Sequence, residues 1–183
     1  MRDFDKRSIF FYEIAGMIFI IILGSLLHFT FEWSNYQSLV GVFSAVNESV
    51  WEHLKIGFWP TLLFAIIEYR FLKKYSNNFL LGKTVGIFVI PVVILVTFYS
   101  YTAILEESLL IDVLTFMGAV IIGQLVSLKL LIHRKLSEKF NIISLVALII
   151  YGLAFIIFTF YPPILPIFQD PISGEYGIII HSN

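Results

Sequence analysis

The segment Ile142–Tyr161, IISLVALIIYGLAFIIFTFY, contains no charged residue over 20 positions. An α-helix rises about 1.5 Å per residue, so about 20 apolar residues match the roughly 30 Å hydrocarbon core of a bilayer. Four further apolar stretches precede it: Ser8–Phe31, Ile56–Phe71, Leu80–Ile104 and Leu109–His133. The sequence therefore predicts an all-α, polytopic membrane bundle of five transmembrane helices.

The overall composition agrees with a membrane environment. Hydrophobic residues make up 58% of the 183-residue chain and charged residues 14%, whereas soluble domains average about 45–50% and 25%. Five spans use about 100 residues, which leaves no room for a separate soluble domain. We predict one five-span domain over residues 1–161. The Pro/Gly-rich tail, residues 162–183, contains four of the six prolines and apolar residues that favour packing on the outer face.

The distribution of Lys and Arg predicts the orientation. Eleven of the twelve cations precede the first stretch, separate the second from the third, or separate the fourth from the fifth; they are Arg2, Lys6, Arg7, Arg70, Lys73, Lys74, Lys83, Lys129, Arg134, Lys135 and Lys139. Only Lys55 falls on the other side. Short cytoplasmic loops collect Lys and Arg, so the N-terminus is predicted inside and the C-terminus outside. A composition rich in Ile, Phe and Lys and without Cys suggests an AT-rich bacterial genome. Together with the predicted spans, this predicts a multi-pass protein of the bacterial plasma membrane.

Several function classes are excluded by composition. A net charge of −1 gives no positive electrostatic field that would attract nucleic acid. The absence of Cys excludes disulfides, thiolate metal sites and Cys nucleophiles. No H-E-x-x-H pattern is present, so there is no zinc-protease motif. The predicted partners are the lipid bilayer and a small molecule or cation, and the oligomeric state stays open.

The densest group of reactive side chains follows the first span. Residues 39–46 are too short to cross a bilayer and are predicted to form an interfacial or re-entrant segment. Eight of the thirteen acids and three of the four His residues fall on this outer face, and such groups suit a divalent metal such as zinc or manganese. The predicted metal ligands are His28, Glu52 and His53. The predicted ligand-binding residues are Asn47, Glu48, Trp51, Glu52 and Asp170, and the tail also supplies His181.

A purely structural explanation of the same residues stays open. Asn47 is a favoured N-cap residue, and Ser49-x-x-Glu52 fits a capping box. Trp51 is then an aromatic anchor at the membrane interface. Under this interpretation the segment is only the start of the second span.

Two acids lie within predicted spans, Glu13 and Glu68. One interpretation makes them anchors at the inner interface, with Glu68 snorkelling beside Arg70. The alternative is a proton or cation path from these acids to the outer face. Pro60 and Pro91 are expected to break two helices, as in transporters whose broken helices line polar sites.

Two segments carry a resemblance, HFTFEWSN (residues 28–35) and FSAVNESVWEHLK (residues 43–55). They resemble the signature of a family of small multi-spanning bacterial membrane proteins, found mainly in Gram-positive anaerobes, with no assigned function. The resemblance implies an integral membrane protein whose signature lies on the outer loop and second span. It implies no substrate, cofactor or catalytic residue.

Three functions fit these observations. The first is a small membrane protein that binds a small ligand or divalent cation at a polar outer-face site, in a transport-related module. The second is a membrane-embedded metal-dependent hydrolase acting on a lipid-linked substrate. The third is a non-catalytic membrane assembly partner that docks through residues 32–55 and the tail. The residues favour the first in its simplest form, binding at the outer face.

Overall fold

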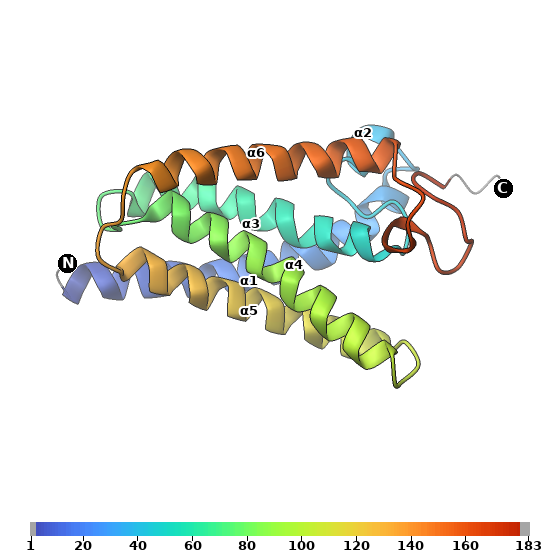
Figure 1. Cartoon of the computed structure of the whole chain (residues 1–183), viewed down its shortest axis with the longest axis horizontal. Coiled ribbons are helices and arrows are strands. Elements are labelled where there is room, and N and C mark those ends of the chain that lie inside the picture. Colours follow the sequence, from blue (N-terminus) through green and yellow to red (C-terminus); the bar gives the residue numbers. More distant parts are fainter. Residues whose placement is uncertain (1–2, 180–183) are drawn as a thin grey trace.

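The computed structural model describes residues 3–179 and is helical throughout, apart from turns and one isolated β-bridge between Gln169 and Tyr176 (Figure 1). The elements, in chain order, are α1 (Asp3–Trp33), α2 (Ser38–Gly41), α3 (Val50–Leu72), α4 (Phe79–Thr102), α5 (Leu109–Ile132), α6 (Lys139–Phe160) and the 3-10 helix η1 (Pro166–Phe168). The predicted all-α class is confirmed.

Four of these helices, α1, α4, α5 and α6, are long and apolar enough to cross a membrane. The fifth long helix, α3, has 23 residues but carries four charged residues, Glu52, Lys55, Glu68 and Arg70, and does not belong to this group. The chain thus has the helices of a membrane protein, while a fifth crossing by α3 stays a prediction.

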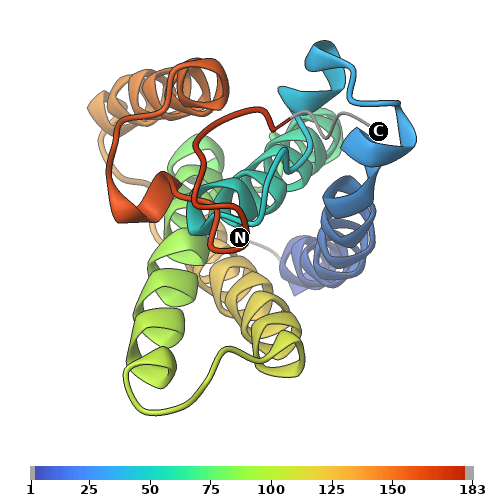
Figure 2. The same cartoon turned by 90° about the vertical axis from the view of Figure 1, so that its right-hand side faces the viewer.

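The long helices form a bundle around α3 and α4. Helix α4 packs along α5, α1 packs against α3 and α5, and α3 packs against α4. Helix α6 covers α4 and α3 on the side away from α5 (Figures 1 and 2). Both α3 and α4 continue through their prolines, Pro60 and Pro91, so neither is a broken helix.

Helices α4 and α5 approach each other closely at two glycines. A Cβ atom added at Gly86 would lie 2.8 Å from the carbonyl oxygen of Gly123, and one added at Gly123 would lie 2.8 Å from that of Gly86. Both separations are too short for any side chain to fit without movement of the helices. Gly86 and Gly123 therefore mark the closest backbone contact described between α4 and α5 at a glycine.

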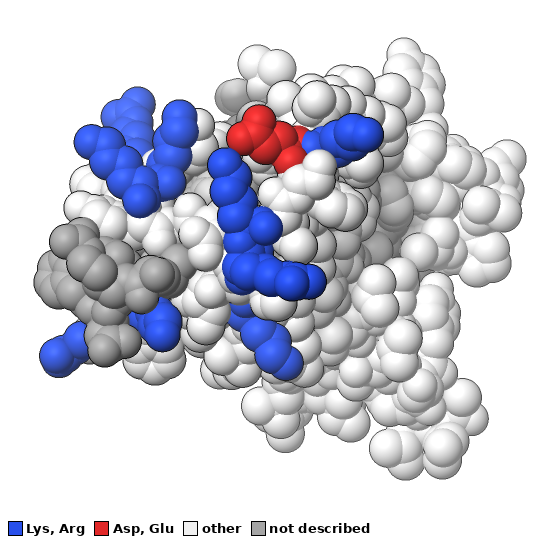
Figure 3. All heavy atoms as spheres, turned by 60° about the vertical axis from the view of Figure 1, so that its left-hand side comes forward, with Lys and Arg blue, Asp and Glu red and all other residues white. Residues whose placement is uncertain are grey.

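The two ends of the bundle differ in charge. One end, here called the cationic end, contains the start of α1, the α3–α4 turn and the α5–α6 connection. All nine exposed Lys and Arg residues within residues 3–179 lie there (Figure 3), and they are Lys6, Arg7, Arg70, Lys73, Lys74, Lys129, Arg134, Lys135 and Lys139. Lys55 and Lys83 are buried instead. Lys83, which the sequence places among the loop cations, lies inside α4.

The opposite end, here called the loop end, carries the long connections. Residues 34–49 fold back over the ends of α1 and α3, where Lys55 Nζ donates to the Gly41 carbonyl at 2.7 Å and Trp59 Nε1 donates to the Val42 carbonyl at 2.9 Å. The tail crosses the same end through η1 and the Gln169–Tyr176 bridge. The loop end is therefore a layer of irregular chain on the ends of the helices.

Candidate metal centre

The last turns of α1 and the 34–49 segment are joined by a buried hydroxyl. Ser44 Oγ accepts hydrogen bonds from Thr30 Oγ1 and the Phe31 amide, both at 2.9 Å, and donates to the Leu27 carbonyl. His28 lies within the turn that these bonds hold. Its position relative to the loop is therefore fixed by backbone contacts on both sides.

The start of α3 fixes a second imidazole. Ser49 is the N-cap, and its side chain accepts from the Glu52 amide at 3.5 Å. The Ser49 carbonyl also accepts a hydrogen bond from His53 Nδ1 at 2.9 Å. A carbonyl can only accept, so this contact places a proton on Nδ1, and Nε2 is the ring nitrogen that can bind a metal ion. Metal-bound histidines are held in the same way by a partner on the second ring nitrogen.

Glu48 joins the two imidazoles. Its Oε2 lies 3.5 Å from His53 Nε2 and 3.7 Å from His28 Nε2. The two rings meet edge to face with centroids 5.1 Å apart. Among residues 6–179, these three residues are the single group of three or more His and acidic side chains whose ligand atoms all lie within 4.8 Å of one another.

The two contacts of Glu48 are close to the spacing of ligand atoms around one metal ion, and all three ligand atoms lie within 4.8 Å of one another. Donor atoms bound about 2.0–2.1 Å from a tetrahedral zinc lie about 3.3 Å from each other. The two contacts of Glu48 need to shorten by only a few tenths of an ångström to reach this value. The side chains of His28, His53 and Glu48 are 24%, 33% and 44% exposed, so an ion can reach them from solvent.

The tail holds Glu48 in place through Asp170. Asp170 Oδ1 accepts from the Glu48 amide at 3.1 Å, and Oδ2 accepts from the Ser173 amide at 2.9 Å and hydroxyl at 2.6 Å. Burial alone would raise the pKa of Asp170, but these hydrogen bonds stabilise the carboxylate and lower the pKa below its usual value. Asp170 therefore serves as a clamp for the backbone of the site.

Asn47 is a second clamp between the loop and the tail. Its Nδ2 donates to the Gly177 carbonyl at 2.8 Å, and its Oδ1 accepts from the Ser49 amide at 2.8 Å. Both polar atoms of the side chain are used by the protein backbone. Asn47 precedes the N-cap instead of capping α3 itself.

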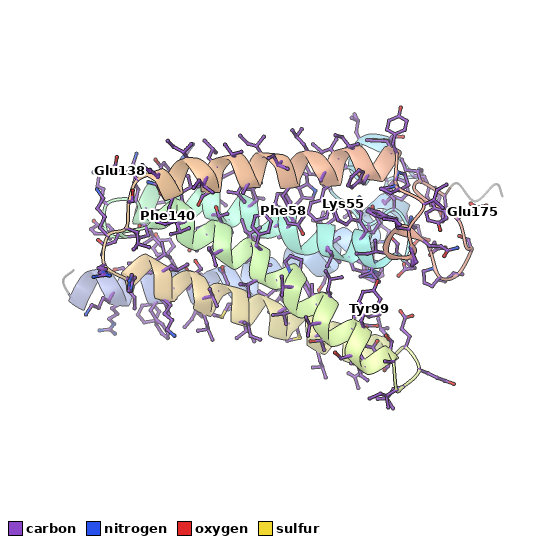
Figure 4. The ribbon with its side chains drawn as sticks, viewed as in Figure 1. Lys55, Phe58, Tyr99, Glu138, Phe140 and Glu175 are labelled. Atoms are coloured by element: carbon purple, nitrogen blue, oxygen red, sulfur yellow. The ribbon has the colours of Figure 1, made fainter. Side chains whose placement is uncertain are left out.

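Glu52 lies on a different face of α3 from His53. Its Oε2 accepts from the Val46 amide at 3.1 Å and forms an ion pair with Lys55, and both side chains are at most 3% exposed. Lys55 Nζ also donates to Thr159 Oγ1 of α6 at 2.9 Å. Figure 4 shows Lys55 inside the bundle between α3 and α6. The structure therefore puts Glu48, and not Glu52, beside the two histidines.

Trp51 packs in an aromatic group at the loop end. Its ring centroid lies 4.7 Å from that of Phe155 and 4.8 Å from that of Phe168. Its Nε1 is buried without a hydrogen-bond partner in the described part of the chain. Trp51 thus joins α3, α6 and η1 and does not face the histidines.

A cleft of about 270 Å³ opens beside the site. His28, Glu48 and Asp170 contribute to its wall, together with Glu32 and Tyr36. Of the other acids on the predicted outer face, Asp112 accepts from Tyr101 Oη at 2.6 Å near the α4–α5 turn, away from this cleft. His181 lies outside the described residues.

A second polar group, deeper in the bundle, is one that the sequence did not reveal as a unit. Glu13 and Glu68 both pair with Lys83 and are buried, so neither anchors the chain at an interface. In the sequence, each of these three charged residues lies about one helical turn inside the end of a predicted apolar stretch. Periodicity does not show that the three meet.

Comparison with models of protein families gives a match over nearly the whole chain. A family model described as "Family of unknown function (DUF6512)" covers residues 3–178. No curated protein and no solved structure shows a significant match. The match extends well beyond the two segments that carry the resemblance, and it agrees with a family that has no assigned function. Since it spans nearly the whole chain, this protein belongs to the DUF6512 family.

Proposed function

We propose that this protein is a five-span protein of the bacterial plasma membrane that binds a divalent metal ion, Zn²⁺ first, at its outer face. The observation that carries the proposal is the position of Glu48 Oε2, within 3.7 Å of the Nε2 atoms of both histidines. Two imidazoles and one carboxylate form a donor set suited to zinc, and the harder Mn²⁺ is the weaker candidate.

The orientation follows from the charge of the two ends. The exposed Lys and Arg residues gather at the cationic end, and short cytoplasmic loops are rich in these residues. With α3 as the fifth crossing, the loop end and its metal site face outward. The charges of α3 are compatible with a crossing because Glu52, Lys55 and Glu68 are buried within the protein and not exposed to lipid.

The interior of the bundle supports metal binding at the outer site without transport of the ion across the membrane. Between the metal site and the buried Glu13 lies a layer formed by Ile20, Ile90 and Val120, each at most 1% exposed. The buried α3 residue at this level, Thr61, donates its hydroxyl to the Gly57 carbonyl of its own helix. A continuous polar path from the outer acids to Glu13 and Glu68 is not present in the described bundle. The outer site therefore acts as a metal-binding module by itself.

One observation favours the hydrolase as a second candidate. Three protein ligands leave one position of a tetrahedral zinc open, as in catalytic sites. His28 and Glu48 also line the cleft, so a bound water could meet a substrate there. Chelator-sensitive turnover of a lipid-linked ester that disappears in His53→Ala would support catalysis. A protein that binds zinc and shows no such turnover is a binding module only.

The test of metal binding uses the full chain in detergent or lipid nanodiscs. Zn²⁺ is expected to bind with a stoichiometry of one and to raise the midpoint of thermal unfolding, because an ion bound only to the folded state stabilises it. His28→Ala and His53→Ala should each abolish this shift. His133→Ala, at the cationic end, is the matched control and should retain it. A wild-type protein without a zinc-dependent shift would contradict metal binding and leave the three side chains as a group of polar contacts.

A further inference from the structure

A second site lies in the half of the bundle nearest the cationic end. Lys83 Nζ donates to Glu13 Oε1 at 2.6 Å and also forms an ion pair with Glu68. Ser127 Oγ donates to the same Glu13 oxygen at 3.1 Å. The four side chains come from α1, α3, α4 and α5, and none is more than 2% exposed. We refer to these four residues as the buried ion cluster.

Apolar layers close the buried ion cluster on both sides. On each of the four helices, the residue four positions toward the cationic end is apolar and buried; these residues are Ile9, Leu72, Phe79 and Leu131. Toward the loop end the main core begins, with Ile20, Ile87, Ile90 and Val120. The layer toward the cationic end is one helical turn deep, whereas the core continues over several turns. The shorter route to water thus leads to the cationic end.

The charges of this cluster do not balance. Two carboxyl groups, Glu13 and Glu68, face one ammonium group, Lys83. Among residues 6–179, the other buried charged side chains are Glu52, Lys55 and Asp170, and all of them lie at the loop end. Helix α5 contributes only neutral polar side chains near the cluster, those of Ser127 and Gln124. Tyr12, the neighbour of Glu13 on α1, stacks on Phe71. One carboxylate is therefore left without a cation, a state that is strongly unfavourable inside a membrane protein.

The unpaired oxygens identify where a further positive charge can bind. Glu13 Oε2 and Glu68 Oε1 are buried and have no hydrogen-bond partner among the described residues. Two carboxyl groups held close together relieve their repulsion by sharing one proton. We propose that Glu13 and Glu68 share one exchangeable proton, which makes the buried ion cluster a proton-binding site that exchanges with the cationic end.

A proton fits this cluster better than a metal cation. The Lys83 ammonium already contacts both carboxylates, and a hard cation needs several more oxygen ligands, whereas a proton needs one. Gln124 Nε2, also without a partner, lies over Gly16 one turn farther toward the loop end. Beyond it the polar side chains give way to the apolar core. The proton is thus bound from one side and does not cross the bundle.

This site is separate from the metal centre. Glu13 and His28 are 15 residues apart on α1, which corresponds to about 22 Å along the helix axis. In the core between them the buried Thr61 of α3 uses its hydroxyl for a hydrogen bond to the Gly57 carbonyl of its own helix. The proposed proton site can therefore be tested independently of zinc binding.

The test is infrared difference spectroscopy of the full chain in lipid nanodiscs, in H₂O and D₂O. A protonated carboxyl group gives a C=O band distinct from that of a carboxylate. The wild-type protein is expected to show one buried protonated carboxyl per chain at neutral pH. Glu13→Gln and Glu68→Gln should each lose this band, because one carboxylate then pairs with Lys83. Lys83→Met should roughly double it, because two carboxyl groups are then left without an ammonium.

The control is Glu138→Gln, an exposed acid of the α5–α6 connection, which should leave the band unchanged. A wild-type spectrum without a protonated carboxyl overturns the proposal, and this measurement needs no variant to fold. Persistence of the band in both Gln variants also overturns it. Loss of the wild-type band on adding Na⁺ at constant pH would assign the cluster to a metal cation instead. The zinc-dependent stabilisation should be the same in Glu68→Gln and wild type.

Discussion

Glu48 and Glu52 lie four positions apart in the sequence, but their carboxylates have different partners. Glu48 Oε2 lies 3.5 Å from His53 Nε2, whereas Glu52 is buried against Lys55. The reason is that α3 begins at Val50. Glu48 therefore lies in the irregular segment before the helix, where the direction of its side chain is not set by the helical period.

This difference predicts opposite effects of two similar substitutions. Glu48→Gln should abolish the zinc-dependent stabilisation, which would be about 2.7 kcal/mol at a zinc concentration 100 times the dissociation constant. Glu52→Gln should keep zinc binding but lower the stability of the zinc-free protein, because it leaves Lys55 buried without its anion. Calorimetric titration and thermal unfolding measure the two effects. Glu175→Gln, an exposed acid of the tail (Figure 4), is the control. Equal loss of zinc binding in both variants would contradict the assignment of Glu48.

Lys55 should be among the most sensitive residues of the loop end. Lys55→Met removes a fully buried ammonium that pairs with Glu52 and donates to Gly41 and Thr159. Breaking a buried pair from one side typically costs about 3–5 kcal/mol, because the remaining charge is uncompensated. The double variant Lys55→Met/Glu52→Gln should lose less than the sum of the two single variants. Reversible unfolding in detergent mixtures measures the cycle, and additive losses would refute a direct coupling.

The α4–α5 contact predicts a difference between two glycines of the same helix. Gly123→Ala should destabilise the bundle by about 1–3 kcal/mol, since its Cβ would meet the Gly86 carbonyl at 2.8 Å. Gly118→Ala should be neutral or slightly stabilising, because a Cβ there meets nothing within 4 Å and Ala is the better helix former. Thermal unfolding of the two variants makes the comparison. Equal stability of both would mean that α4 and α5 are farther apart than described.

The proposed orientation can be tested on single-cysteine variants, because the natural chain contains no Cys. Tyr75→Cys, in the α3–α4 turn, should react with a membrane-impermeant thiol reagent only after the cells are permeabilised. Glu107→Cys, in the α4–α5 turn, should react in intact cells. The charge difference between the two ends is the physical reason. Labelling of position 75 in intact cells would overturn both the orientation and the outward position of the metal centre.

The Asp170 clamp predicts a pH-dependent contribution to stability. Its folded-state pKa is lowered by hydrogen bonds from Ser173 and Glu48, against the opposing effect of burial. A group with a lowered folded pKa stabilises the protein fully above its unfolded value, about 3.9 for Asp, and loses this contribution as the pH falls through the folded value. Wild type should thus exceed Asp170→Asn in stability at neutral pH, and the difference should shrink below about pH 4. Thermal unfolding across this range tests the sign, and a difference that grows toward acid pH would exclude the clamp.

Much of the helical framework could be predicted from the order of residues. The apolar run Ile142–Tyr161 became α6 over Lys139–Phe160, and the run Leu109–His133 became α5 over Leu109–Ile132. A long apolar segment must satisfy its backbone hydrogen bonds internally when water is absent, and a helix does this with local contacts alone. Short-range information was therefore sufficient for these elements. Short-range information was less useful for α3. The burial of its charged residues is explained only by their ion-pair partners, which the structure shows.

The sequence by itself determined which segments are helical, which end carries the exposed cations, and that His28 and His53 belong to one polar end. Only the tertiary structure decided which acid meets the histidines and that Glu13, Lys83 and Glu68 form one cluster. Their contacts join residues 5 to 70 positions apart. They depend on the rotation of each helix about its axis. That rotation is set by packing such as the Gly86–Gly123 approach. A local sequence pattern does not predict this rotation, because the contacting partners come from different segments of the chain.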